Sequence, residues 1–140
     1  MREDISQALA IDDRSTLEDR TIDITTVGRR SGRPRRIEIV FYRLREDIYL
    51  SGVPGSRTRD WLANLAAHPQ FTFHLKRGVV ADLPATATVV LDPAERRRVL
   101  AVFAAEFNRR RRPDSSWPPA VLDEWVEHSP LAKVTFQDTD

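Results

Sequence analysis

Apolar and polar residues alternate along two runs in the first third of the chain, 21–27 and 35–42. The residues that share one face of each run are Ile22, Ile24 and Thr26 in the first, and Ile37, Ile39 and Phe41 in the second. A period of two is typical of strands that bury one face. Turn-forming Gly28, Gly32 and Pro34 separate the two runs, so we expect an antiparallel hairpin.

Similar patterns continue along the rest of the chain. Further strands are expected near 47–52, over 70–76, within 79–91 and over 130–136. Pro84 interrupts the pattern at 79–91, which therefore gives one strand or two. Apolar residues at helical spacing predict helices within 57–69, over 92–107 and within 120–128. Asp92 is the expected N-cap of the second helix, with Pro93 at its first position.

These elements indicate an α+β fold that is mainly β. Strands joined by short turns are antiparallel, and closing the sheet removes its exposed edges. We therefore expect a barrel of about six mostly antiparallel strands with two or three packed helices. A chain of 140 residues suits a single domain over 21–140, preceded by an N-terminal arm over 1–20 that is loose or helical.

Composition excludes several kinds of chemistry. The chain has no cysteine, and His68, His74 and His128 do not stand at metal-binding spacing, so we expect no metal site. The N-terminus lacks the order of a signal peptide, and no apolar run is long enough to cross a membrane. We expect a cytoplasmic protein. A net charge of +1 argues against nucleic-acid binding through a general positive field.

The expected hairpin turn is very basic, because GRRSGRPRR at 28–36 holds five arginines in nine positions. Three interpretations remain open. The arginines could simply be hydrated at a loop tip. Gly-Arg-Pro flanked by arginines resembles an AT-hook, which binds a narrow minor groove. Alternatively the turn is an anion cradle, since guanidinium groups bind phosphate and carboxylate bidentately.

A second basic loop, SGVPGSRTRDW at 51–61, follows an expected strand and opens an expected helix. Arg57 and Arg59 lie near the first turn of that helix, where the helix dipole also favours an anion. Together the two loops could hold one polyanionic ligand. The sequence carries no nucleophile elbow, P-loop or other catalytic set, so the catalytic residues stay unknown and a reactive group would come from a cofactor.

Two blocks of the sequence resemble the deazaflavin-dependent nitroreductase family. TTVGRRSGRPRRIEIVF resembles the strand, basic turn and strand of that family, and SGVPGSRTRDWLANLAAHPQFTFHLK resembles its next block, which includes W-x-x-N-L-x-A-x-P. The resemblance covers about 21–100. It implies a split β-barrel that binds coenzyme F420, an 8-hydroxy-5-deazaflavin with a phosphate and an oligoglutamate tail.

The resemblance also implies a set of cofactor-binding residues. In the first block, Arg30 and Arg35 would bind the anionic tail, Ser31 would be a further cofactor-binding residue, and Ile37, Glu38 and Ile39 would offer backbone groups to the ring. In the second block, Val53, Pro54 and Arg57 would form a phosphate loop, with Trp61 nearby. Residues 108–128, with Trp117 and Trp125, are candidates to cover the ring face.

The expected function is hydride transfer from reduced F420 to a small electrophilic acceptor, namely a quinone, a nitro compound or an enone. One alternative is an FMN-dependent split-barrel reductase. The others are a non-catalytic deazaflavin- or flavin-binding protein and, more distantly, an AT-hook-like nucleic-acid binder. The expected partners are a small-molecule cofactor and substrate, with no nucleic acid, and the chain is a monomer or a homodimer. The sequence does not name the proton donor.

Overall fold

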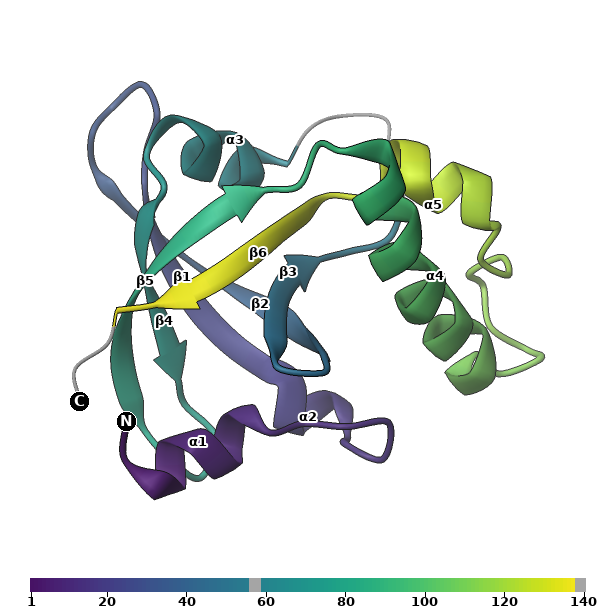
Figure 1. Ribbon diagram of the computed structural model, residues 1–140, viewed down its shortest axis with the longest axis horizontal. Coiled ribbons are helices and arrows are strands. Elements are labelled where there is room, and N and C mark those ends of the chain that lie inside the picture. The colour runs from purple at the N-terminus through teal and green to yellow at the C-terminus, as the bar shows by residue number, and fades with distance from the viewer. Residues whose placement is uncertain (56–58, 138–140) are drawn as a thin grey trace.

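Six antiparallel strands form a closed barrel in the computed structural model, which describes residues 1–55 and 59–137 (Figure 1). The strands are β1 (Thr21–Val27), β2 (Pro34–Leu44), β3 (Asp47–Ser51), β4 (Gln70–Leu75), β5 (Ala81–Val89) and β6 (Leu131–Phe136). Around the barrel they follow the order β1-β2-β3-β6-β5-β4, and β1 pairs with β4 to close it. The predicted six-stranded antiparallel barrel is confirmed.

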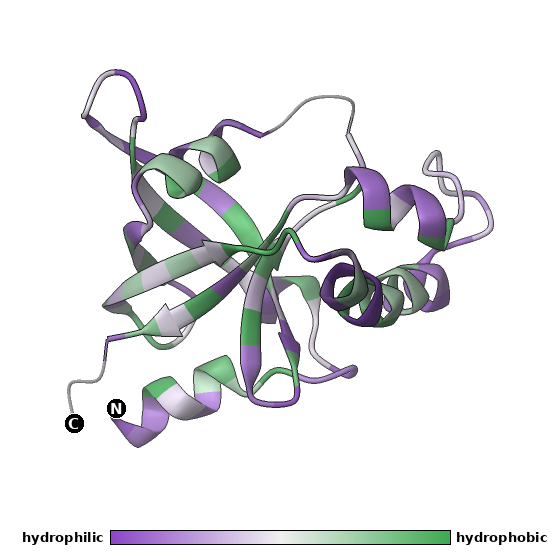
Figure 2. Ribbon diagram, turned by 45° about the horizontal axis from the view of Figure 1, so that its top comes forward, coloured by the Kyte–Doolittle hydropathy of each residue, from purple (hydrophilic) through white to green (hydrophobic). Residues whose placement is uncertain are grey.

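The barrel interior is filled by the apolar face of each alternating run. The register pairs Ile24 with Ile37 of β2 and with Phe73 of β4. Ile24, Phe41 and Phe73 are fully buried, and the Phe41 and Phe73 rings meet edge to face at 5.4 Å between centroids. Figure 2 shows the alternation of polar and apolar residues along the strands. Each such side chain contributes roughly 1.5–3 kcal/mol by leaving water.

Five helices surround the barrel in the described part of the chain, where two or three were expected. They are α1 (Glu3–Leu9), α2 (Leu17–Arg20), α3 (Asp60–Ala67), α4 (Pro93–Arg110) and α5 (Leu122–His128). The additional ones, α1 and α2, are too short to show a strong helical period. α1 buries Ile5 and Leu9 in the barrel core, and α2 begins with a capping box between Thr16 and Asp19.

β5 is one continuous strand that runs through Pro84, so the proline does not divide it. Pro84 pairs with Thr72 on β4, whereas pairing with β6 begins only at Ala85. The missing N–H of the proline therefore falls where the ladder with β6 ends, which is a place that a strand tolerates proline. The Pro84 carbonyl still accepts a hydrogen bond from the Gln137 N–H at 3.1 Å.

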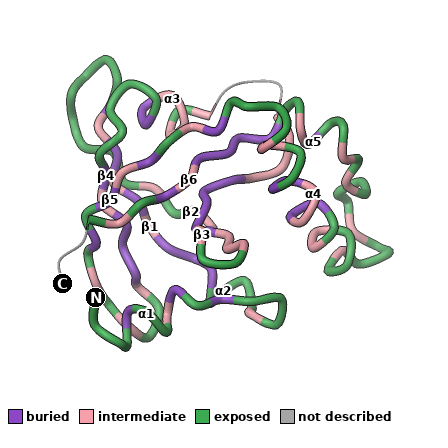
Figure 3. The backbone as a smooth tube through the Cα atoms, viewed as in Figure 1, coloured by how far each residue is buried: buried purple, intermediate pink, exposed green. Residues whose placement is uncertain are grey.

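α4 and α5 form a second hydrophobic cluster on one side of the barrel (Figure 1). α4 begins as expected, with the Asp92 carboxylate accepting a hydrogen bond from the Glu95 N–H at 2.9 Å. Phe103 of α4 stacks on Tyr42 of β2 at 4.7 Å between ring centroids. Figure 3 shows the buried residues concentrated along the strands and the exposed residues on the outer turns of α4. This cluster fixes α4 against β2 and β3.

Part of β2 extends past the strand pairs that close the barrel. β1 pairs with β2 from Pro34 to Val40, but β3 pairs with β2 only from Phe41 to Leu44. Over residues 34–40 the edge of β2 that faces away from β1 therefore has no strand partner in the described part of the chain. Half of the backbone N–H and C=O groups of this stretch point to that edge. This open edge positions the candidate site.

Across residues 1–55 and 59–137, no helix combines the length and the apolar character needed to cross a membrane.

Candidate cofactor site

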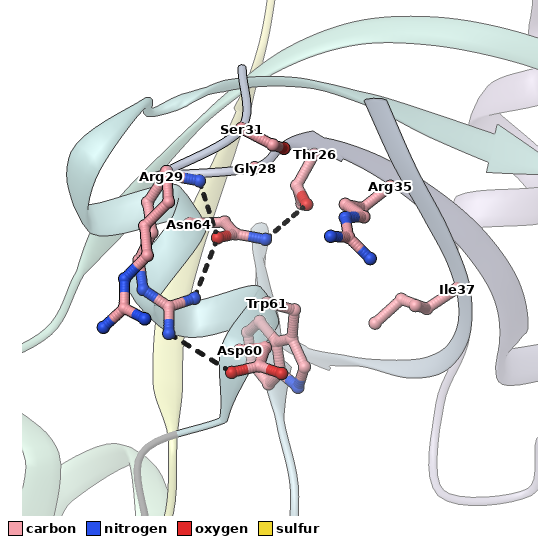
Figure 4. Close-up of a pocket in the computed structure, with 10 residues that line it drawn as sticks. Thr26, Gly28, Arg29, Ser31, Arg35, Ile37, Asp60, Trp61 and Asn64 are labelled. Atoms are coloured by element: carbon pink, nitrogen blue, oxygen red, sulfur yellow. Dashed lines mark hydrogen bonds and ion pairs between the residues drawn. The ribbon is translucent and has the colours of Figure 1, made fainter. Parts of the chain in front are cut away.

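A cavity of about 410 Å³ lies between the basic turn, the start of β2 and the helix α3 (Figure 4). Its lining residues are Thr26, Gly28, Arg29, Arg30, Ser31, Arg35, Ile37, Asp60, Trp61 and Asn64. In Figure 4, Arg35 and Ile37 extend from β2 toward the side of the cavity that α3 closes with Trp61. The basic turn is therefore one wall of a cavity.

The turn has a fixed backbone. The Gly28 N–H donates to the Arg33 carbonyl at 2.8 Å, and the Gly32 N–H donates to the Gly28 carbonyl at 2.8 Å. Gly32 has φ +70°, a conformation that favours glycine. The Ser31 hydroxyl oxygen accepts a hydrogen bond from the Arg33 N–H at 3.1 Å. Ser31 also lines the cavity, and its O–H remains free to donate a hydrogen bond to a ligand.

Asn64 of α3 ties the turn to the helix. This residue is buried, and its side-chain oxygen accepts hydrogen bonds from the Arg29 N–H at 3.0 Å and from Arg29 Nη1 at 3.1 Å. Its side-chain nitrogen donates to Thr26 Oγ1 at 3.3 Å. Arg29 also pairs with Asp60 at 3.4 Å. These contacts make Arg29 a structural residue of the turn.

The arginines of the turn divide into two groups. Arg29 is held by Asn64 and Asp60, and Arg36 pairs with Asp23 at 2.9 Å. The guanidinium groups of Arg30, Arg33 and Arg35 make no hydrogen bond or ion pair with any other residue that the structure describes. Arg30 and Arg35 line the cavity, whereas Arg33 does not. Two residues with unpaired guanidinium groups therefore line the same cavity, and this arrangement suits a ligand with several anionic groups.

The cavity is apolar on its other side. Ile37 and Trp61 are half-buried and pack against the barrel core. The open edge of β2 over residues 34–40 runs beside them and includes the peptide groups of residues 37–39. Side-chain cations, an apolar wall and unpaired backbone groups thus adjoin one another, as in a site for a ligand that is anionic at one end and flat at the other.

A model of the F420H(2)-dependent quinone reductase family matches residues 12–116, three quarters of the chain. The chain belongs to this family. The resemblance to the deazaflavin-dependent reductases that the basic turn and the W-x-x-N-L block indicated is therefore confirmed. No curated protein sequence shows significant similarity to the chain.

Solved structures share the fold at low sequence identity. An FMN-binding protein related to pyridoxamine 5′-phosphate oxidase, from Nostoc punctiforme, is similar with a TM-score of 0.64 at 18% identity, over 96% of this chain and 80% of that chain. A conserved hypothetical protein from Mycobacterium tuberculosis gives 0.63 at 19% identity, over 99% and 82% of the two chains. HutZ, the haem storage protein from Vibrio cholerae, gives 0.58 at 15% identity, over 99% and 92%. The predicted split-barrel fold is confirmed.

Five of the residues predicted for this family's cofactor line the cavity: Arg30, Ser31, Arg35, Ile37 and Trp61. Four others lie elsewhere. Glu38 pairs with Lys76 on the outer face of the barrel, and Ile39 packs against the barrel core. Val53 packs against the cluster of α4 and α5, and Pro54 is half-buried in the loop that follows β3. Arg57 lies outside the described residues. The cofactor-binding roles of all ten stay predictions.

The structure adds cavity residues that the sequence did not single out, namely Thr26, Gly28, Arg29, Asp60 and Asn64. Asn64 had a signal in the sequence, because it follows Trp61 by three residues within a helix and so shares a face with it. Arg29 had no such signal, since Arg29 and its neighbour Arg30 look alike in the sequence. Only the contact with a residue 35 positions away distinguishes them.

A polar network covers the outer face of β1, β2 and β4. Lys76 Nζ donates to Asp23 at 2.7 Å and also pairs with Glu38. The hydrogen bond from Lys76 is the main reason that the pKa of Asp23 lies below its ordinary value, and the hydrogen bond from Arg36 lowers it further. The pKa of Lys76 is raised in turn, first by Asp23 and then by Glu38. This network stabilises the face of β2 opposite to Ile37.

Proposed function

We propose that the protein transfers hydride from reduced coenzyme F420 to a small electrophilic acceptor: a quinone, a nitro compound or an enone. Membership of the F420H(2)-dependent quinone reductase family supports the proposal. The observation that carries it is the placement of Arg30 and Arg35, two residues with unpaired guanidinium groups that line one cavity with Ile37 and Trp61. If the arginines of the turn were only hydrated at a loop tip, we would not expect two of them to line a cavity.

The residues of the cavity have distinct roles in this proposal. When bound, reduced F420 supplies the hydride. Arg30 and Arg35 bind the phosphate and the carboxylates of its tail through paired N–H groups. The Ser31 hydroxyl oxygen accepts a hydrogen bond from the Arg33 N–H, and its O–H donates a hydrogen bond to the same anionic groups. Asn64 keeps the turn at a fixed distance from α3, so the cations are preorganised before the ligand arrives.

The open edge of β2 holds the flat end of the cofactor. The backbone groups of Ile37, Glu38 and Ile39 that face away from β1 are available to bind the polar edge of the ring. Ile37 and Trp61 supply apolar surface beside it and exclude water. Glu38 takes part through its backbone only, because its side chain is engaged with Lys76 on the outer face.

FMN is the alternative cofactor. The FMN-binding protein from Nostoc punctiforme shares the fold, so FMN is tested beside F420. FMN has a flat ring and a phosphate but no glutamate tail. It therefore needs fewer cations than the turn and the cavity offer. The alternative to an enzyme is a non-catalytic protein that binds the cofactor. In either case we expect the protein to bind small molecules in the cytoplasm as a monomer or a homodimer.

The test is a pair of calorimetric titrations of the apoprotein, one with F420 and one with FMN, followed by turnover. The proposal predicts micromolar binding of F420, weaker binding of FMN, and oxidation of reduced F420 by menadione or by a nitro compound. Tighter binding of FMN than of F420 would contradict the choice of cofactor. Tight binding of reduced F420 with no oxidation by any quinone, nitro compound or enone would favour the non-catalytic alternative.

A further inference from the structure

Three polar side chains on the outer face of the barrel form a hydrogen-bonded chain that takes no part in the cofactor site. They are Thr25 of β1, His74 of β4 and Asp82 of β5. The hydroxyl oxygen of Thr25 lies 2.7 Å from Nε2 of His74, and Nδ1 of the same ring lies 2.7 Å from Oδ1 of Asp82. A hydroxyl, an imidazole and a carboxylate joined through these two ring nitrogens have the order of a catalytic triad.

The chemistry of these groups determines which ring nitrogen carries the proton. A carboxylate only accepts hydrogen bonds, so Nδ1 of His74 is protonated and donates to Asp82. In the neutral imidazole, Nε2 then has no proton and accepts the hydrogen bond from the Thr25 hydroxyl. Nε2 is therefore placed to remove the hydroxyl proton, which is the role of a general base beside a nucleophile.

The barrel strands hold the three groups in this order. The register of β4 and β5 places His74 directly opposite Asp82, and the register of β1 and β4 places Thr25 opposite Thr72, two residues from His74. His74 is 7% exposed, whereas Thr25 is half-buried. The side chain of Asp82 is 74% exposed. The base is thus shielded from water by its neighbours, while the hydroxyl is partly accessible from the outside.

The charged groups beside the hydroxyl also suit attack on a carbonyl. Arg36 of β2 is the cross-strand partner of Thr25. The carboxylate next to both residues, that of Asp23, accepts hydrogen bonds from Arg36 at 2.9 Å and from Lys76 at 2.7 Å, so it is already engaged. A guanidinium beside the nucleophile favours the negative charge that develops on a carbonyl oxygen under attack. One hydroxyl therefore adjoins a base and a cation.

We propose that Thr25 is an acyl-acceptor site that reacts with small activated esters. The Thr25 oxygen attacks the carbonyl carbon of the ester while its proton passes to Nε2 of His74. The bond between the carbonyl carbon and the leaving-group oxygen then breaks, the leaving group departs as its anion, and the imidazole releases the proton to solvent. The product is an ester of Thr25. No electron transfer occurs, so the proposal does not depend on F420 or on the cofactor cavity.

The test treats the whole protein with p-nitrophenyl acetate at about pH 8, where imidazoles are neutral, and locates acetyl groups by peptide mass spectrometry. Thr72 is the matched control, because it is the half-buried cross-strand partner of Thr25 and has no hydrogen bond to a histidine among the described residues. A general base typically contributes at least about 100-fold, so Thr25 should be acetylated at least about 100-fold faster than Thr72. Alkaline hydroxylamine should remove this acetyl group, since it cleaves esters but not the amides formed on lysines.

Two variants separate the base from its surroundings. Asp82→Asn keeps the size of an exposed side chain but removes the charge that orients the imidazole, so acetylation of Thr25 should slow by roughly tenfold or more. His74→Gln removes the base and should slow Thr25 to the rate of Thr72. If His74→Gln does not fold, Asp82→Asn and the comparison of the two threonines in the unaltered chain still decide. Equal acetylation of Thr25 and Thr72, or an unchanged Thr25 rate in Asp82→Asn, would overturn the proposal.

Discussion

The side-chain oxygen of Asn64 accepts two hydrogen bonds from Arg29, one from its backbone N–H at 3.0 Å and one from its guanidinium at 3.1 Å. This contact joins the basic turn to α3 across 35 positions of sequence. It removes Arg29 from the set of cations available to a ligand. It also fixes the backbone beside Arg30, a residue that lines the cavity.

Loss of the Asn64 side chain is expected to destabilise the protein and to loosen the cavity. Asn64→Ala removes the acceptor of the partly buried hydrogen bond from the Arg29 N–H and should cost about 1 kcal/mol of unfolding free energy, measured by urea denaturation. Affinity for F420 should fall as well, since the turn is no longer preorganised. Asn64→Ala with unchanged stability and unchanged F420 affinity would show that the contact does not position the turn.

Gly28 allows the turn to close on itself. A Cβ at this position would lie 2.5 Å from Ser31 Oγ and 3.3 Å from the Arg33 carbonyl oxygen. In Gly28→Ala the Ser31 hydroxyl must rotate away and lose its hydrogen bond to the Arg33 N–H. We expect a cost of about 1 kcal/mol in unfolding free energy and weaker F420 binding.

The double variant Gly28→Ala with Ser31→Ala separates the two causes. Removing the hydroxyl relieves the contact, so the stability of the double variant should exceed that of Gly28→Ala, and a double-mutant cycle should show a coupling of at least about 0.5 kcal/mol. Strictly additive effects would mean that the Ser31 contact is not what makes glycine necessary at position 28.

The outer network should make stability depend on pH at the acid end. The folded-state pKa of Asp23 is lowered, chiefly by the hydrogen bond from Lys76, so its contribution is present above the ordinary pKa of an aspartate, about 3.9, and is lost as pH falls through the lower folded value. Lys76→Met should raise the pKa of Asp23, as followed by carboxyl NMR titration. It should also lower the urea midpoint more at pH 7 than at pH 3. An equal effect at both pH values would contradict this linkage.

The barrel could be predicted from the sequence because its strands alternate cleanly. Ile22 and Ile24 on one strand and Ile37 and Phe41 on the next give a period of two that only a sheet with a buried face satisfies. Pro84 was harder to interpret, because whether a proline breaks a strand depends on what the neighbouring strands offer at that point. In the structure, pairing with β6 starts one residue later.

The division of the arginines could not be predicted in the same way. Arg29 and Arg30 are adjacent and chemically identical. Their hydrogen bonding differs only because Asn64 lies next to Arg29. The ion pair between Arg20 and Glu106 has the same character, since these residues are far apart in the chain and meet only when α4 packs on the barrel. Local patterns specify strands and turns, whereas these pairings depend on tertiary packing.

The central claim is that Arg30 and Arg35 bind the anionic tail of the cofactor, and Arg33 supplies a matched control within the same turn. All three guanidinium groups are unpaired among the described residues, but Arg33 does not line the cavity. The direct measurement is calorimetric affinity for F420. Arg30→Ala and Arg35→Ala should each weaken binding by roughly tenfold, and Arg33→Ala by less than about twofold. An Arg33→Ala loss as large as the other two, or no loss in any of the three, would contradict the account.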